Sequence, residues 1–305
     1  MKLIVAGGTG FIGSALSARL TGQGHSLILL TRSISSAAES SNTTTILWQP
    51  ALSGAWEHIL EEAVAEADGV INLAGEPIAA KRWSDAQKTK LRSSRIDTTR
   101  ALVTAIGKAK KKPAFFINAS AVGYYGPRAD EVITEESGHG GDFLAAVCSE
   151  WEEEARKAEA HGVRVIRLRT GIVLGKGGGA LSKMIPPFKL FIGGPLGSGK
   201  QWMPWVHIED EIGLIQFLME NNSARGAVNA CAPNPVTMKE FSRTLSRVLH
   251  RPCWAPVPAF ALHLLLGEMA DMLLTGQRVM PAAAQKLGYR FRHPELREAI
   301  EALLR

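Results

Sequence analysis

The chain opens with Leu3-Ile4-Val5-Ala6-Gly7-Gly8-Thr9-Gly10-Phe11-Ile12-Gly13, and this stretch decides the fold. Its four apolar residues predict a buried strand, and the glycines that follow satisfy the pattern G-x-G-x-x-G. A helix should begin within the pattern, because apolar residues recur on one helical face up to Gly22. Glycine lets the backbone approach a pyrophosphate closely, and a helix N-terminus offers unpaired N–H groups to phosphates. The stretch therefore predicts a dinucleotide-binding turn rather than a tight connection without a ligand.

Short apolar runs alternate with longer amphipathic runs through the first half of the chain. Strands are expected at 3–6, 27–30, 70–73, 115–117 and 163–168, and helices at 11–22, 56–66, 85–110 and 143–159. This alternation predicts an α/β protein with a doubly wound parallel sheet, the Rossmann fold. After Arg169 a stretch rich in Gly and Pro precedes helices expected at 210–220, 237–249, 260–273 and 294–304. We therefore predict an NADP-binding domain over 1–170 and a smaller, mostly helical substrate lobe over 171–305, with some return of the chain around 203–230.

Arg32 is the residue expected to choose between NADP and NAD. It ends the second predicted strand, about 20 residues after Gly13, where an acidic residue would bind the ribose 2′-hydroxyl of NAD. The next acidic residue is Glu39. A guanidinium at this position can pair with a 2′-phosphate through charge-assisted hydrogen bonds. We therefore predict NADP(H) as the cofactor, the alternative being that Arg32 is a solvated surface residue.

Further motifs follow the glycine loop in a fixed order. In chain order they are Asn72-Leu73-Ala74-Gly75-Glu76, Ser120-Ala121-Val122-Gly123-Tyr124-Tyr125-Gly126, Trp151-Glu152, the runs 169–175 and 193–199, Trp205-Val206-His207-Ile208, and the run 276–281. Over nearly the whole chain this set resembles the extended short-chain dehydrogenase/reductase superfamily, and within it an atypical group called epimerase family proteins, some of them labelled cell-division inhibitors. The resemblance implies cofactor contacts at Gly7, Thr9, Gly10, Phe11, Ile12, Gly13, Thr31, Arg32, Ala74, Glu76, Arg82 and the backbone near Ile172.

The catalytic pair of that superfamily, Tyr-x-x-x-Lys, has no counterpart in this sequence. The best superposition of the matching helix puts Leu144 and Cys148 at the two positions, so the phenolate that accepts a proton during hydride transfer is missing. Three other hydroxyls remain as catalytic candidates. Ser120 would bond a substrate oxygen or cap local backbone, and Tyr124 and Tyr125 would supply a phenol or pack within their loop.

Two functions from different classes therefore stay open. One is an NADP(H)-dependent oxidoreductase or epimerase-like enzyme acting on a small molecule, such as a nucleotide sugar or a small carbonyl compound. The other is a non-catalytic sensor or scaffold that binds NADPH. The glycine-rich loop over 193–199 favours the enzyme, whereas the missing Tyr-x-x-x-Lys pair favours the sensor. A monomer or a homodimer is expected.

Three further sequence patterns are weaker evidence for a functional site. The run His207-Ile208-Glu209-Asp210 has no second histidine at i+4, and acidic residues suit the first turn of a helix, so we predict no metal site. Residues 194–200 fit a Walker A motif until Gln201, which stands where Ser or Thr is needed. Lys81 and Arg82 follow Glu76 and could face the cofactor phosphates or lie on a solvated surface.

Composition limits the class of protein. The 305 residues are 46% hydrophobic and 21% charged, which excludes a disordered chain. Cys148, Cys231 and Cys253 lie far apart, which indicates a reducing compartment rather than disulfides. The apolar run over 260–266 is interrupted and too short to span a bilayer, and the basic run over 108–112 lacks the aromatic residues typical of nucleic-acid binding. We therefore expect a soluble, cytoplasmic protein that contacts neither membrane nor nucleic acid.

Overall fold

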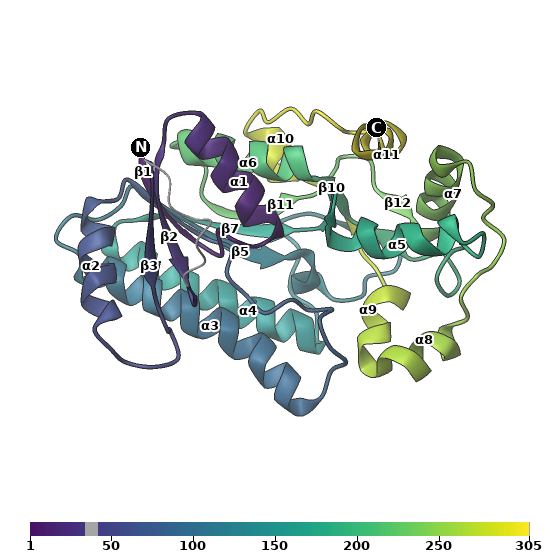
Figure 1. The fold of residues 1–305 in the computed structure, drawn as a ribbon, viewed down its shortest axis with the longest axis horizontal. Coiled ribbons are helices and arrows are strands. Elements are labelled where there is room, and N and C mark those ends of the chain that lie inside the picture. The colour runs from purple at the N-terminus through teal and green to yellow at the C-terminus, as the bar shows by residue number, and fades with distance from the viewer. Residues whose placement is uncertain (34–41, 305) are drawn as a thin grey trace.

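The computed structural model describes residues 1–33 and 42–304, and a seven-stranded sheet forms its centre (Figure 1). The strand order is β11-β7-β5-β4-β1-β2-β3, and every pair in it is parallel. The strands are β1 (Lys2–Ala6), β2 (Ser26–Thr31), β3 (Thr43–Leu47), β4 (Gly69–Asn72), β5 (Phe115–Ala121), β7 (Arg164–Thr170) and β11 (Gly226–Ala230). Buried runs such as that of β4 are expected where helices cover both faces. The predicted Rossmann fold is confirmed.

Helices cover the two faces of the sheet in separate layers. One face packs against α1 (Phe11–Gly22) and α6 (Ile208–Glu220), and the other against α2 (Trp56–Glu66), α3 (Asp85–Lys108) and α4 (Phe143–Arg156). Leu16 of α1 and Leu102 of α3 are fully buried on their respective faces. Because the strands are parallel, their carboxyl ends share one edge, and the loops that follow them gather there.

The sheet is completed by chain from the second half of the sequence. After β7 the chain leaves the sheet, and it returns as α6 and then β11, which pairs with β7 from Ile166 to Thr170. The sequence patterns did not predict β11, a short Gly-Ala-Val-Asn-Ala segment with one β-branched residue, nor the Thr-rich β3. The predicted helix over 143–159 ends earlier, at Arg156, where a 3₁₀ segment begins (Lys157–His161).

The C-terminal lobe is mostly helical, as predicted. Its core lies between α5 (Gly179–Lys189), α7 (Met238–Leu249) and α11 (Leu296–Leu304), beside a short pair formed by β8 (Ile172–Gly175) and β10 (Trp205–His207). The single helix predicted over 260–273 is wrong. Gly267 has φ +62° and divides the segment into α8 (Ala259–Leu266), a 3₁₀ turn and α9 (Asp271–Leu274). Over the described ranges, no helix has both the length and the apolar character needed to cross a membrane.

Candidate cofactor and active site

The glycine loop after β1 leaves no room for side chains at two positions. Gly7 has φ +77°, and a Cβ there would lie 2.7 Å from the carbonyl carbon of Leu73. A Cβ on Gly13 would lie 2.1 Å from the carbonyl oxygen of Gly7. At Gly10, the N-cap of α1, no described side chain caps the helix, and its first turn holds no acidic residue. The positive end of α1 is therefore open to an anion at the strand-end edge, which fits the pyrophosphate of a dinucleotide.

The ring of Phe11 joins this loop to the C-terminal lobe. It lies so close to the turn between β8 and α5 that a Cβ on Gly175, Gly178 or Gly179 would come within 2.4–2.9 Å of it. The run of glycines in this turn is therefore explained by contact with Phe11. The Phe11 ring holds the start of the lobe against the predicted cofactor loop.

Arg32 and Glu76 face the same region from the ends of β2 and β4. Arg32 is exposed, and the Thr31 hydroxyl beside it donates to the carbonyl oxygen of Ser33 at 2.8 Å. Burial opposes ionisation of Glu76, but the hydrogen bond and charge of Lys90, at 3.0 Å, together with the charge of Arg32, outweigh it and lower the pKa of this carboxyl. The two predicted cofactor residues are thus close enough to interact electrostatically.

A buried amide network shapes the loop that follows β4. The Asn72 side chain accepts from the Ala74 N–H at 3.2 Å and donates to Asn118 Oδ1 at 2.7 Å and to Thr99 Oγ1 at 3.0 Å. Trp151 Nε1 donates to the same threonine at 2.8 Å. Because these residues come from β4, β5, α3 and α4, the network fixes the predicted cofactor residue Ala74 relative to the sheet. Sequence reasoning missed the network, since its members are distant along the chain.

Ser120 lies at the end of β5 but does not have a free hydroxyl. It is 3% exposed and donates to Glu152 Oε1 at 2.7 Å. The same carboxylate accepts from Arg169 through two bonds, at 2.7 Å from Nε and 2.8 Å from Nη2. Glu152 and Arg169 are both buried, so each charge depends on the other. Neither was singled out from the sequence as a site residue.

The adjacent tyrosines have different environments. Tyr125 is fully buried, donates to Asn229 Oδ1 at 2.7 Å and accepts from Arg169 Nη1 at 2.9 Å. Burial raises the pKa of Tyr125 to about 12, despite the opposing effect of Arg169. Tyr124 is partly exposed, and the Arg169 guanidinium carbon lies 3.5 Å from the centre of its ring. Of the two phenols, Tyr124 alone is partly open to solvent.

Leu144 and Cys148, which the superposition puts at the positions of the catalytic pair, lie on the face of α4 that packs against the 3₁₀ segment after β5 (Val122–Tyr125). A Cβ on Gly123 would lie 3.5 Å from Leu144 Cβ and 4.0 Å from Cys148 Sγ. Burial raises the pKa of the Cys148 thiol to about 12, so the thiol stays protonated at neutral pH. Neither side chain therefore replaces the tyrosine or the lysine of the Tyr-x-x-x-Lys pair.

The remaining predicted contacts lie nearer the lobe. The exposed Arg82 side chain lies against Gly267, where a Cβ would come within 2.7 Å of its Nε. In the same segment, the Ala79 carbonyl accepts from Lys183 at 3.1 Å. Ile172 starts β8, and its N–H donates to the carbonyl of Pro204 at 2.6 Å. The 77–84 segment therefore bridges the edge of the sheet and the lobe.

A buried acid lies beside the carboxyl end of β7. Thr170 Oγ1 donates to Glu211 Oε1 at 2.8 Å, and the other carboxyl oxygen has no partner among the described residues. Burial raises the pKa of Glu211 to about 8. Glu211 was not singled out from the sequence, and the raised pKa keeps its carboxyl mostly protonated at neutral pH.

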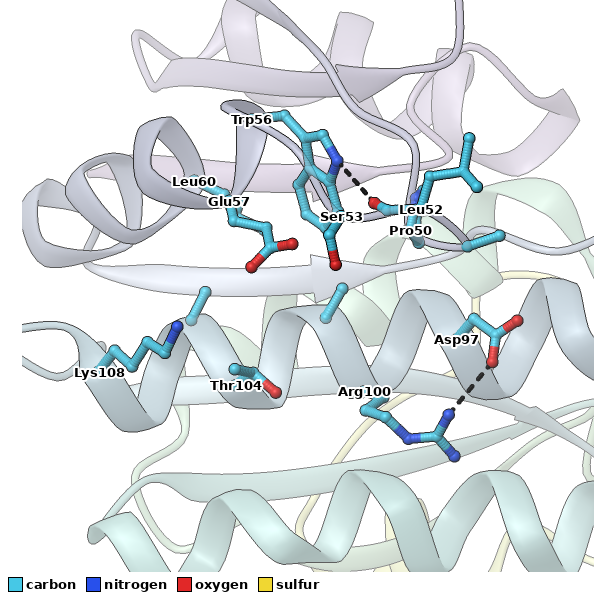
Figure 2. A pocket seen from close by; sticks show the side chains of 13 residues that line it. Pro50, Leu52, Ser53, Trp56, Glu57, Leu60, Asp97, Arg100, Thr104 and Lys108 are labelled. Atoms are coloured by element: carbon cyan, nitrogen blue, oxygen red, sulfur yellow. Dashed lines mark hydrogen bonds and ion pairs between the residues drawn. The ribbon is translucent and has the colours of Figure 1, made fainter.

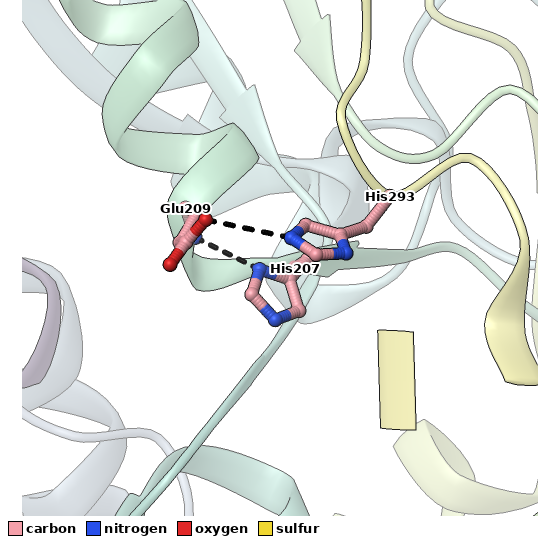
Figure 3. A group of neighbouring side chains, drawn as sticks. All are labelled: His207, Glu209 and His293. Atoms are coloured by element: carbon pink, nitrogen blue, oxygen red, sulfur yellow. Dashed lines mark hydrogen bonds and ion pairs between the residues drawn. The ribbon is translucent and has the colours of Figure 1, made fainter. Parts of the chain in front are cut away.

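Figure 3 shows His207, Glu209 and His293 side by side. His207 Nδ1 accepts from the Glu209 N–H at 3.1 Å and so caps α6, while His293 Nε2 lies 3.4 Å from Glu209 Oε2. The two imidazole rings stack with centroids 3.8 Å apart and planes 32° apart. One possible ligand atom from each of the three residues lies within 4.8 Å of the others, which is a spacing that could hold a metal ion. The contacts observed are those of a helix cap, and the absence of a metal site stays a prediction, because the i+4 spacing on which it rests did not take His293 into account.

A separate cavity lies between α2 and α3 (Figure 2). Trp56 forms one wall, its indole N–H donating to the Leu52 carbonyl at 3.0 Å, and Arg100 and Lys108 lie on the opposite side. None of the predicted site residues lines this cavity. It is therefore distinct from the edge where the strand ends meet.

Comparison of the sequence with known protein families agrees with the fold and the glycine loop described above. Residues 3–231 match the NAD dependent epimerase/dehydratase family. The chain belongs to this family. Residues 257–303 also match a domain of unknown function, DUF1731, which covers much of the lobe after α7.

Relatives within the epimerase/dehydratase family span the full chain. The chloroplastic SDR39U1 homolog of Arabidopsis thaliana, an epimerase family protein, is 44% identical over 100% of this chain and 87% of that protein. Epimerase family protein YfhF of Bacillus subtilis is 41% identical over 100% and 98%. The crystal structure of human epimerase family protein SDR39U1 with NADPH superposes with a TM-score of 0.88 at 34% identity, covering 99% of both chains. The resemblance predicted from the motifs is confirmed.

Proposed function

We propose that this protein binds NADP(H) at the strand-end edge and uses it in an oxidoreductase or epimerase-like reaction on a small molecule. The observation that carries the proposal is the glycine cradle at Gly7 and Gly13, with exposed Arg32 at the end of the neighbouring strand. The cradle fits a pyrophosphate, and the guanidinium suits a 2′-phosphate. The human relative crystallised with NADPH supports the same cofactor.

The reacting group is proposed to be a carbonyl or a secondary alcohol, of a nucleotide sugar or a small carbonyl compound. Bound NADPH would supply a hydride to the carbonyl carbon, and NADP⁺ would accept one from the alcohol. Tyr124 is the proposed proton donor to the carbonyl oxygen, because its phenol is partly exposed and its ring lies over Arg169. Ser120 and Tyr125 are proposed as positioning residues, since Glu152 and Asn229 already accept their hydroxyl protons.

The test is an assay of hydride exchange. The protein would be loaded with NADP⁺ or NADPH and incubated with alcohols, carbonyl compounds and UDP-sugars, while the near-ultraviolet absorbance of reduced nicotinamide is followed. Turnover that falls about 10²–10⁴-fold in Tyr124→Phe is the expected result. Tyr289→Phe is the matched control, because that phenol donates to the Asp210 carbonyl at 3.0 Å and is not one of the predicted site residues. Turnover unchanged in Tyr124→Phe would show that the proton comes from elsewhere.

One observation favours a second function, a sensor or scaffold that holds NADPH without catalysis. Leu144 has no proton to transfer, burial keeps the Cys148 thiol protonated, and the Ser120 hydroxyl donates to Glu152. In that case NADPH would bind tightly, no compound in the assay would change the absorbance, and Tyr124→Phe would leave NADPH affinity unaltered. A substrate-dependent absorbance change would exclude this function.

A further inference from the structure

The C-terminal lobe exposes a cluster of large apolar side chains. Leu190, Phe191 and Ile192 after α5 are 69%, 55% and 55% exposed, and Trp254 is 67% exposed. The Trp254 indole N–H donates to the Phe191 carbonyl at 2.8 Å, and its backbone N–H donates to Gly193 at 3.1 Å. These contacts bring two segments together into one surface, which we name the lobe patch: Leu190, Phe191, Ile192 and Trp254.

The helix α8 adds a second apolar surface at the same end of the molecule, far from β3 (Figure 1). Its Phe260, Leu264 and Leu265 are 70–76% exposed. The chain between Trp254 and α8 is held to the loop after the patch, because Val257 exchanges backbone hydrogen bonds with Pro195 and Gly197. The three aromatic side chains of these surfaces alone expose about 300–500 Å², as much as the whole of the largest apolar patch on a typical monomer.

The charged residues in the sequence that forms these surfaces are cationic. Both surfaces are supplied by the stretches 160–208 and 241–267, and neither stretch contains an Asp or a Glu. Exposed Lys189 adjoins the patch in the chain, and the Arg251 guanidinium carbon lies 4.9 Å from the centre of the Phe191 ring. Arg243 is close enough to Cys253 to affect its thiol electrostatically. The lobe patch therefore has an apolar centre and a cationic rim.

We propose that the lobe patch and α8 dock the protein on an anionic lipid bilayer. The cationic rim complements acidic headgroups, whereas it would repel the same rim on a second copy. Of the acids nearest α8, Glu268 pairs with Lys88, and Asp271 lies 3.7 Å from His263. Exposed Leu and Ile side chains suit acyl chains, and Trp and Phe suit the headgroup boundary. The prediction of no membrane contact considered a spanning segment, which a surface lying on the bilayer does not need.

The test is co-sedimentation of the full chain with vesicles of phosphatidylcholine alone or mixed equally with phosphatidylglycerol. The protein should sediment with the mixed vesicles and much less with phosphatidylcholine, and added salt should release it. Trp254→Ser together with Ile192→Ser should lower partitioning at least tenfold. Ile192→Ser alone, which leaves the indole bond in place, should lower it severalfold. Ile59→Ser, at an apolar residue 48% exposed on α2, is the matched control.

A second pair of variants tests the contribution of the cationic rim to vesicle binding. Lys189→Glu should weaken binding to the mixed vesicles severalfold, and Lys111→Glu, the same change at an exposed residue after α3, should not. The proposal is overturned if the wild type does not sediment with mixed vesicles at low salt, or if Ile192→Ser and the double variant sediment like the wild type. A wild-type dimer in analytical ultracentrifugation that the double variant cannot form would also overturn it, because a second copy would then cover the patch.

Discussion

Glu211 should make the protein less stable as the pH rises, and Glu211→Gln should remove that effect. Burial raises the pKa of this carboxyl from its ordinary value near 4.5 to about 8, so the folded state binds its proton more tightly than the unfolded state. For such a group the stabilisation is fully present below the unfolded pKa and is lost as the pH rises through the folded pKa. The affected window therefore runs from about pH 4.5 to about pH 8.

The size of the effect follows from the shift. One pKa unit corresponds to about 1.4 kcal/mol, so the free energy of unfolding should fall by roughly 1.4 kcal/mol per pH unit, or roughly 4 kcal/mol between pH 5 and pH 8. Glutamine cannot ionise, and its amide oxygen can still accept the hydrogen bond from Thr170. The variant should therefore gain stability over the wild type steadily across this window.

Urea unfolding of both proteins at several pH values measures the difference. The comparison must be between variant and wild type, because burial lowers the pKa of His207 to about 4 and gives the opposite slope at acidic pH in both proteins. Glu298→Gln on the exposed side of α11 makes the same chemical change at the surface and serves as the control. A difference between Glu211→Gln and the wild type that stays constant from pH 5 to pH 8 would refute the reasoning.

Three further outcomes are expected. The wild type should bind NADPH at least tenfold more tightly than NADH, because Arg32 can make two charge-assisted contacts of roughly 1.5–3 kcal/mol each with the 2′-phosphate. Arg32→Asp should reverse this preference, and equal affinities of the wild type for both cofactors in calorimetric titration would contradict it. Gly10→Val should abolish NADPH binding while circular dichroism stays native, because its Cβ meets only the Gly7 carbonyl, at 3.3 Å; unchanged affinity would move the phosphate site elsewhere. Tyr125→Phe should lower the free energy of unfolding by roughly 1–3 kcal/mol in urea, since Asn229 and Arg169 lose a buried partner; unaltered stability would count against that network.

Candidate cofactor residues could be proposed from the sequence because their determinants are local. Each depends on one strand end and the few residues after it, such as Gly7–Gly13 or Arg32, and parallel strands place all such ends along one edge. The order of motifs then gave the family. The sequence patterns did not predict the strand β11, because its short sequence of mostly small residues lacks the alternation and the run of β-branched residues that are typical of a strand.

The catalytic side could not be predicted in the same way. Ser120, Glu152 and Arg169 form one hydrogen-bonded cluster only after β5, α4 and β7 have packed. Asp210 and Glu211 look like solvated acids of a first helical turn, yet both are fully buried, and Asp210 accepts from the backbone N–H groups of Arg292 and His293. Such partners lie too far along the chain for spacing to indicate them.

The late return of β11 to the sheet also bears on how the protein is made. Its first residue, Gly226, follows the end of β7 by about 55 residues, which takes a ribosome roughly 3–11 s to translate. Throughout that interval the outer edge of β7 presents unpaired backbone groups, the kind of edge on which chains aggregate. The sheet can therefore be completed only after the residues between β7 and β11 have been synthesised. A nascent chain halted between the two strands would be a natural client for a chaperone.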